Sequence, residues 1–115
     1  MSALNDQALE YVAKYFKALA EPMRLKVLNA LQDGEKNVGQ LTEMSGCTQA
    51  NVSKHLSLLA NYDLVKRESR GTSVYYSISD PSVYELCELV CGQIGKRMAL
   101  EDEIKKMFIK ASHAT

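Results

Sequence analysis

The sequence lacks any uninterrupted apolar run that could cross a bilayer, since a transmembrane helix needs roughly 20 consecutive apolar residues. It also lacks a secretory signal, because residues 1–6 contain no basic region followed by an apolar one. No internal repeat, low-complexity stretch or linker interrupts the 115 residues. We therefore expect a cytoplasmic protein without membrane contact. Its length fits one compact core, which predicts a single domain over residues 1–115.

Cysteine is scarce, and charge of one sign is not in excess. Three cysteines are an odd number and do not form the framework of a secreted disulfide protein, so free thiols or metal ligands fit better. Lys plus Arg and Asp plus Glu both number 14. This balance does not exclude a nucleic-acid partner, because the local field at a docking face decides binding. The segment Thr48–Tyr76 is mildly basic, whereas Tyr84–Asp102 is mildly acidic.

Two helices are expected in the first third of the chain. Apolar residues recur there at three- and four-residue steps, which predicts a helix over about Asp6–Leu19. Pro22 suits the first turn of a second helix, and Asp33–Gly34 is expected to end it with a left-handed glycine.

The next two predicted helices form a helix-turn-helix pattern. A short helix over Val38–Met44 closes at Ser45–Gly46, and Thr48 is a good N-cap for a helix over Gln49–Ala60. The second of these helices has a narrow apolar stripe and is otherwise polar. Two short helices joined by a tight glycine-containing turn are typical of DNA-binding proteins.

After the fourth predicted helix, the helical spacing of apolar residues gives way to strand-forming segments. Leu64–Glu68 and Ser73–Ile78 are rich in β-branched and aromatic residues, and Ser69–Thr72 lies between them, which predicts a β-hairpin with a basic tip. Asp80–Ser82 should begin one last helix that continues to Phe108. The expected fold is mainly α with a β-hairpin wing, a winged helix-turn-helix of order α-α-α-α-β-β-α.

This constellation predicts DNA binding, because the second helix of such a motif fits the major groove and the hairpin tip reaches the adjacent backbone or minor groove. Gln49 and Asn51 can pair with adenine, Ser53 suits either base type, and Lys54 can contact guanine or phosphate. Arg70 is placed for a minor-groove or phosphate contact. His55 could orient the helix or touch phosphate. The candidate DNA-binding residues are Thr48, Gln49, Ala50, Asn51, Ser53, Lys54, His55 and Arg70. Taken singly, each of these side chains could also be merely solvent-exposed.

Three motifs carry a resemblance to the ArsR/SmtB family of repressors. Ala18–Leu28 resembles the family's second-helix signature, Thr48–Leu56 its recognition helix, and Gly71–Tyr76 its wing and second strand. The resemblance covers nearly the whole chain. It implies a winged-helix homodimer, joined by its first and last helices, that represses by occluding a promoter on double-stranded operator DNA.

The sequence supports dimerisation independently, because apolar residues of the first and last helices would leave an exposed patch on a monomer. These residues are Leu9, Val12, Phe16, Leu86, Val90 and Ile94. A twofold dimer would also contact two half-sites one DNA turn apart.

The cysteines are candidates for sensing. Cys87 and Cys91 are four residues apart and so share one helical face, where they could supply two thiolates to a soft ion such as As(III), Cd(II) or Zn(II). The pair could instead be oxidised, or pack as small hydrophobes. Cys47, at the start of the recognition helix, is either structural or a third ligand. No cofactor is required by this interpretation.

The metal sites known in the family do not transfer to this chain. Its third-helix thiolate motif would fall where this sequence has Asn37 and Gly39. Its last-helix zinc motif could begin at Asp80, but the following ligand positions hold Ser82, Gln93 and Lys96.

Four functions stay open. The leading one is a repressor released when the thiol pair is metallated or oxidised, and a second is a constitutive regulator without inducer. A small dithiol redox enzyme is disfavoured, because the chain has no Cys-x-x-Cys motif. A protein-interaction module is disfavoured by the polar recognition helix. We therefore expect a regulator and no enzyme.

Overall fold

The computed structural model describes residues 3–97 and 100–112, and the chain divides into two compact units, residues 1–79 and 80–115. The first unit contains α1 (Asp6–Leu19), α2 (Pro22–Ala30), β1 (Lys36–Asn37), α3 (Val38–Ser45), α4 (Gln49–Asn61), β2 (Val65–Arg70) and β3 (Ser73–Ile78). The second contains α5 (Ser82–Arg97) and α6 (Asp102–Ser112). Within the described ranges, none of the helices is long and apolar enough to span a bilayer.

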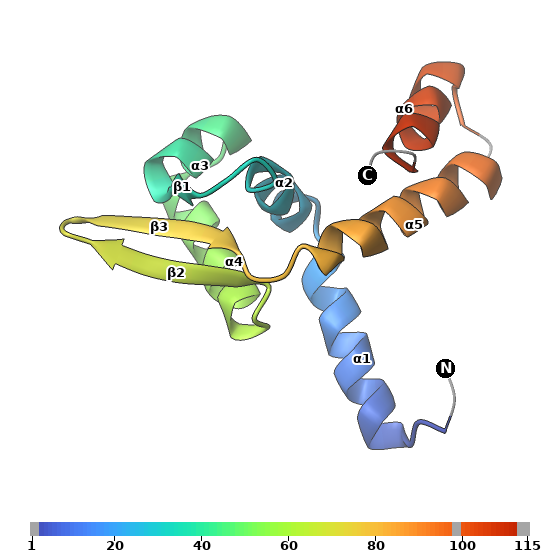
Figure 1. Cartoon of the computed structure of the whole chain (residues 1–115), viewed down its shortest axis with the longest axis horizontal. Helices are drawn as coiled ribbons and strands as arrows, with labels where there is room; N and C mark the ends of the chain where they lie inside the picture. The colour runs from blue at the N-terminus through green and yellow to red at the C-terminus, as the bar shows by residue number, and fades with distance from the viewer. Residues whose placement is uncertain (1–2, 98–99, 113–115) are drawn as a thin grey trace. The chain divides into compact units, whose positions relative to one another are not determined.

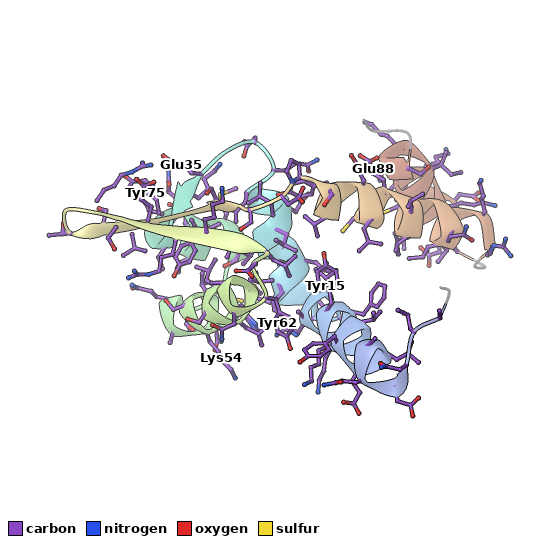
Figure 2. The ribbon with its side chains drawn as sticks, turned by 60° about the horizontal axis from the view of Figure 1, so that its bottom comes forward. Tyr15, Glu35, Lys54, Tyr62, Tyr75 and Glu88 are labelled. Atoms are coloured by element: carbon purple, nitrogen blue, oxygen red, sulfur yellow. The ribbon has the colours of Figure 1, made fainter. Side chains whose placement is uncertain are left out.

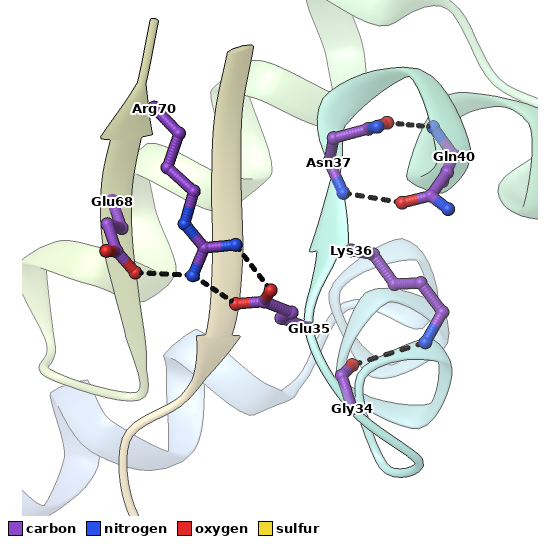
Figure 3. Close-up of polar contacts among 7 residues, drawn as sticks. All are labelled: Gly34, Glu35, Lys36, Asn37, Gln40, Glu68 and Arg70. Carbon is purple, nitrogen blue, oxygen red and sulfur yellow. Dashed lines mark hydrogen bonds and ion pairs between the residues drawn. The ribbon is translucent and has the colours of Figure 1, made fainter.

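Local capping explains where α3 and α4 begin and end. The Asn37 side chain accepts a hydrogen bond from the Gln40 backbone, and the Gln40 side chain accepts one from the Asn37 backbone, which forms a capping box (Figure 3). Gly46 ends α3 with a φ of 71°, a conformation that glycine adopts without strain. Thr48 then caps α4 by accepting from the Asn51 backbone. The predicted helix-turn-helix is therefore confirmed.

The end of α2 differs from the prediction. The helix stops at Ala30, and hydrogen-bonded turns lead from there to Gly34. Gly34 does adopt a positive φ of 140°, but it follows these turns instead of capping the helix directly.

The wing is confirmed, and a third strand joins it. β2 and β3 pair antiparallel with Arg70 opposite Ser73, so only Gly71 and Thr72 form the loop. Gly71 has a φ of 61°, as the first loop position of a type II′ turn requires. β1 pairs with the other edge of β3, giving the order β1-β3-β2 (Figure 1). A two-residue strand is too short to show an alternating pattern, which is why the sequence did not predict it.

The core of the first unit lies between α2, α3, α4 and the base of the hairpin. Val52, Leu56 and Leu59 form the buried stripe of α4, and they are fully excluded from solvent. The other buried apolar residues of this unit are Ala18, Leu19, Val27, Leu28, Leu31, Leu41, Leu64, Val65 and Tyr76. Burial of one side of α4 fixes which of its side chains remain exposed.

The prediction of one last helix reaching Phe108 is wrong. α5 ends at Arg97 and α6 begins at Asp102, and the two helices pack together. The predicted position Met98 lies outside the described residues. Close packing is possible because Gly95 is buried on α5: a Cβ atom there would lie 3.2 Å from the Cβ of Phe108. Apolar periodicity continues on both helices, so it could not reveal the break.

Candidate DNA-binding site

The candidate site is the solvent-facing side of α4. Gln49, Asn51 and Lys54 are exposed, and Ser53 is half-buried. Lys54 points away from the body of the unit (Figure 2). It takes part in none of the ion pairs found among the described residues, so its charge remains available to a phosphate. Thr48 and Ala50 are exposed in the same first turn.

His55 lies on the other side of this helix, against the start of α2. Its Nδ1 atom lies 3.4 Å from Nη1 of Arg24, and its Nε2 atom lies 3.4 Å from Oε2 of Glu21. Because a guanidinium can only donate, the Arg24 contact suits a ring that accepts at Nδ1. The side chain is only 17% exposed. His55 is therefore held against the start of α2, a placement that fits the first of its two predicted roles, although that role stays a prediction.

Arg24 connects three helices at this point. Its Nε atom donates to the Ala18 carbonyl at 2.6 Å and its Nη2 atom donates to the Lys17 carbonyl at 3.1 Å, which satisfies carbonyls at the C-terminus of α1. A cation is favoured at this end of a helix by the helix dipole. Through His55, the same side chain also contacts α4.

Arg70 lies at the tip of the hairpin, as predicted, but its guanidinium is already bound. Its Nη1 and Nη2 atoms donate to the two oxygens of Glu35 at 2.6 and 2.9 Å, and Nη2 also donates to Glu68 at 2.8 Å (Figure 3). The guanidinium carbon lies 4.7 Å from the ring centroid of Tyr75. The hydrogen bonds to Glu35, and next those to Glu68, raise the pKa of Arg70 further above its ordinary value. Arg70, for which a DNA contact is predicted, is thus bound by two carboxylates in this structure.

The cysteine pair lies in the second unit. Cys87 and Cys91 are both half-buried on α5, and all three cysteines are free. Burial, and to a smaller extent the neighbouring Cys91, raises the pKa of the Cys87 thiol. Within residues 3–97 and 100–112, no group of three His, Cys, Asp or Glu side chains could hold a metal ion. Two thiolates fit a soft ion chemically, but they leave a trigonal or tetrahedral site incomplete within one described chain.

Comparison with known proteins agrees with this architecture. Residues 21–67 match the model of the family described as "Bacterial regulatory protein, arsR family". The chain is 37% identical over 94 residues to the arsenical resistance operon repressor of Bacillus subtilis (strain 168), covering 76% of this chain and 90% of that protein. This chain belongs to the arsR family. It is accordingly a DNA-binding transcriptional regulator with a winged helix-turn-helix fold.

Two further relatives of this arsR-family chain show the range of the similarity. It is 39% identical over 77 residues to the probable mercury resistance operon repressor of Streptomyces lividans, covering 67% of this chain and 62% of that protein. A solution structure of a homodimeric winged helix-turn-helix DNA-binding domain from Mycobacterium bovis superposes with a TM-score of 0.70 at 27% identity. That superposition covers 88% of this chain and 99% of the other.

Proposed function

We propose that the chain is a homodimeric cytoplasmic repressor that contacts operator DNA through the first turns of α4 and is released when Cys87 and Cys91 bind a soft ion or are oxidised. The single observation that carries the DNA-binding part is the division of α4 into two sides. Its apolar stripe is fully buried, and Gln49, Asn51 and Lys54 are left exposed on a helix that fits the major groove.

The exposed side chains of α4 divide by what they would contact. Gln49 and Asn51 carry amides that can pair with an adenine edge, and Ser53 can approach either base type. Lys54 is a flexible point charge suited to phosphate or to guanine. No acidic residue interrupts Gln49–Asn61. The local field of α4 is therefore attractive to DNA although the formal net charge of the chain is 0.

Exposed apolar residues on three helices support the dimer. Leu9 and Phe16 of the predicted interface are exposed on α1, and Val90 is 47% exposed on α5. Further exposed large apolar residues on these helices and on α6 are Tyr11, Leu89, Ile104, Met107 and Ile109. A second copy of the chain is the occupant we propose, because the Mycobacterium bovis domain with this fold is a homodimer.

The sensing part rests on chemistry and on the named relatives. Two thiolates spaced one helical turn apart suit As(III), Cd(II) or Zn(II), and a third donor would come from Cys47, the partner subunit or solvent. One relative is named an arsenical resistance operon repressor and another a probable mercury resistance operon repressor. Arsenic and mercury both form soft ions that bind thiolates. Promoter occlusion without any inducer is the second candidate, since half-buried thiols also pack as small hydrophobes.

The DNA-binding part is tested with single variants of α4 and the promoter of the protein's own gene. Gln49→Ala or Ser53→Ala should relax base preference at one half-site position, at a cost of about 1–3 kcal/mol. Lys54→Ala should instead weaken binding to all sequences and make the salt dependence shallower by about 0.9 in slope per lost phosphate contact. Ser57→Ala, an exposed position further along α4, serves as the control. Parent-like binding by all three test variants would show that α4 is not the docking element.

A further inference from the structure

The contact between Arg70 and Glu35 joins segments that are 35 residues apart. Glu35 directly precedes β1, in the connection between α2 and α3, whereas Arg70 is the last residue of β2 before the hairpin loop. The hairpin extends beyond α3 and α4 (Figure 1). The ion pair therefore ties the tip of the wing to the segment that leads into the helix-turn-helix.

The way Arg70 is held leaves it no free pair of parallel N–H groups for a phosphate. A guanidinium binds phosphate best through two parallel N–H groups, and each such pair includes an Nη2 hydrogen. Nη2 has two hydrogens, and it already donates to Glu35 at 2.9 Å and to Glu68 at 2.8 Å. Arg70, Glu35 and Glu68 together carry one net negative charge, so the positive charge of Arg70 is offset where it lies.

We propose that Glu35 competes with operator phosphate for Arg70, so that the wing docks only when this guanidinium exchanges a carboxylate for a phosphate. This inference rests on the proposed DNA-binding function. A carboxylate and a phosphate offer the same pair of acceptor oxygens to the same N–H groups. Arg70 remains 44% exposed in the contact, so a phosphate can reach it as Glu35 leaves.

The competition acts on all DNA sequences alike. A phosphate contact carries no base information, so the carboxylate lowers affinity for operator and for unrelated DNA by the same factor. Base discrimination is then left to α4. The contact persists at neutral pH, because hydrogen bonding to Arg70 holds the pKa of Glu35 below its ordinary value.

The test is a binding titration over a series of salt concentrations, with the parent chain, Glu35→Gln and Glu35→Ala. The probes are the operator duplex and an unrelated duplex of equal length. Asp33→Asn is the matched control, because it removes one negative charge from the same connection. In the parent chain Asp33 pairs with Lys36 at 2.8 Å and not with Arg70. Circular dichroism and a thermal melt confirm that each variant is folded.

We expect both Glu35 variants to bind the two duplexes more tightly by the same factor. The slope of log K against log salt should become more negative by about 0.9 for each wing that gains a phosphate contact. The gain should disappear when Arg70→Gln is added to Glu35→Gln, and Asp33→Asn should show no gain.

Unchanged or weaker binding by the Glu35 variants would overturn the inference, because the contact would then only position the wing. A gain that survives the loss of Arg70 would overturn it as well, because any removed charge would then suffice. The two proposals fail in different ways. If the proposed function fails, the parent chain itself does not bind the operator, whereas failure of this inference leaves the effects of the α4 variants intact.

Discussion

Cys87 is the cysteine whose ionisation is disfavoured by its surroundings. Its half-burial and its neighbour Cys91 raise its pKa, so less of it is thiolate at neutral pH than in an unfolded chain. A soft ion must displace the thiol proton before it binds. Loading of the pair should therefore become easier as the pH rises toward the raised pKa of Cys87.

Single serine variants test whether Cys87 and Cys91 sense a soft ion. With As(III), Cd(II) or Zn(II) added, the parent chain should lose operator affinity by about 5- to 150-fold, the range of a typical allosteric coupling. Cys87→Ser and Cys91→Ser should keep their affinity, because one thiolate cannot chelate the ion. Cys47→Ser is the comparison that decides whether a third thiol takes part. If the added ion released both single variants from the operator as readily as the parent chain, Cys87 and Cys91 would serve only as packing residues of α5.

Individual contacts were the least predictable part of the site. The candidate residues of α4 could be assigned because helical periodicity separates Val52 and Leu56 from their polar neighbours. The contacts of His55 with Glu21 and Arg24 and of Arg70 with Glu35 could not, because these partners lie more than 30 residues away in sequence and no periodic pattern connects them. Glu35 carries no local signal at all, and only the pairing of β1 with β3 brings its segment to the wing.

At the scale of elements, capping and turn residues gave the most reliable predictions. Thr48, Gly46 and Pro22 lie where helices begin or end, as their chemistry requires. The break between α5 and α6 was missed, although Gly92 and Gly95 provide a signal in retrospect. A Cβ atom on Gly92 would lie 3.3 Å from Cβ of Ser112, so both glycines mark the surface on which α6 packs.

A larger side chain at Gly95 should separate α6 from α5. Gly95→Leu would place atoms where Phe108 and the Ile109 backbone now lie, at 3.2 and 3.5 Å from the new Cβ. Overpacking of this kind costs about 1–3 kcal/mol, while leucine itself favours the helical conformation of α5. Hydrogen exchange should accelerate across Asp102–Ser112. Lys96→Leu, at the exposed neighbouring position, is the control and should leave the exchange of Asp102–Ser112 unchanged. Unchanged exchange in Gly95→Leu would show that α6 does not pack against Gly95.

At the scale of the whole molecule, the proposal requires two copies of the chain. One α4 offers a short contact surface, and a twofold dimer doubles it while fixing the distance between the two recognition helices. A charge on the exposed apolar face of α5 should break this arrangement without touching α4. Val90→Glu is the suitable variant, and Gln93→Glu, on the same helix, is its control.

Footprinting on the protein's own promoter, combined with sedimentation of the same samples, tests the central claim most directly. We predict that the parent chain and Gln93→Glu sediment as dimers and protect two half-sites whose centres are about 10 base pairs, or a multiple of one DNA turn, apart. Val90→Glu should sediment as monomer or aggregate and protect neither half-site at the same concentration. A well-behaved monomeric parent chain, or protection of a single half-site, would contradict the account of a dimeric operator-binding repressor.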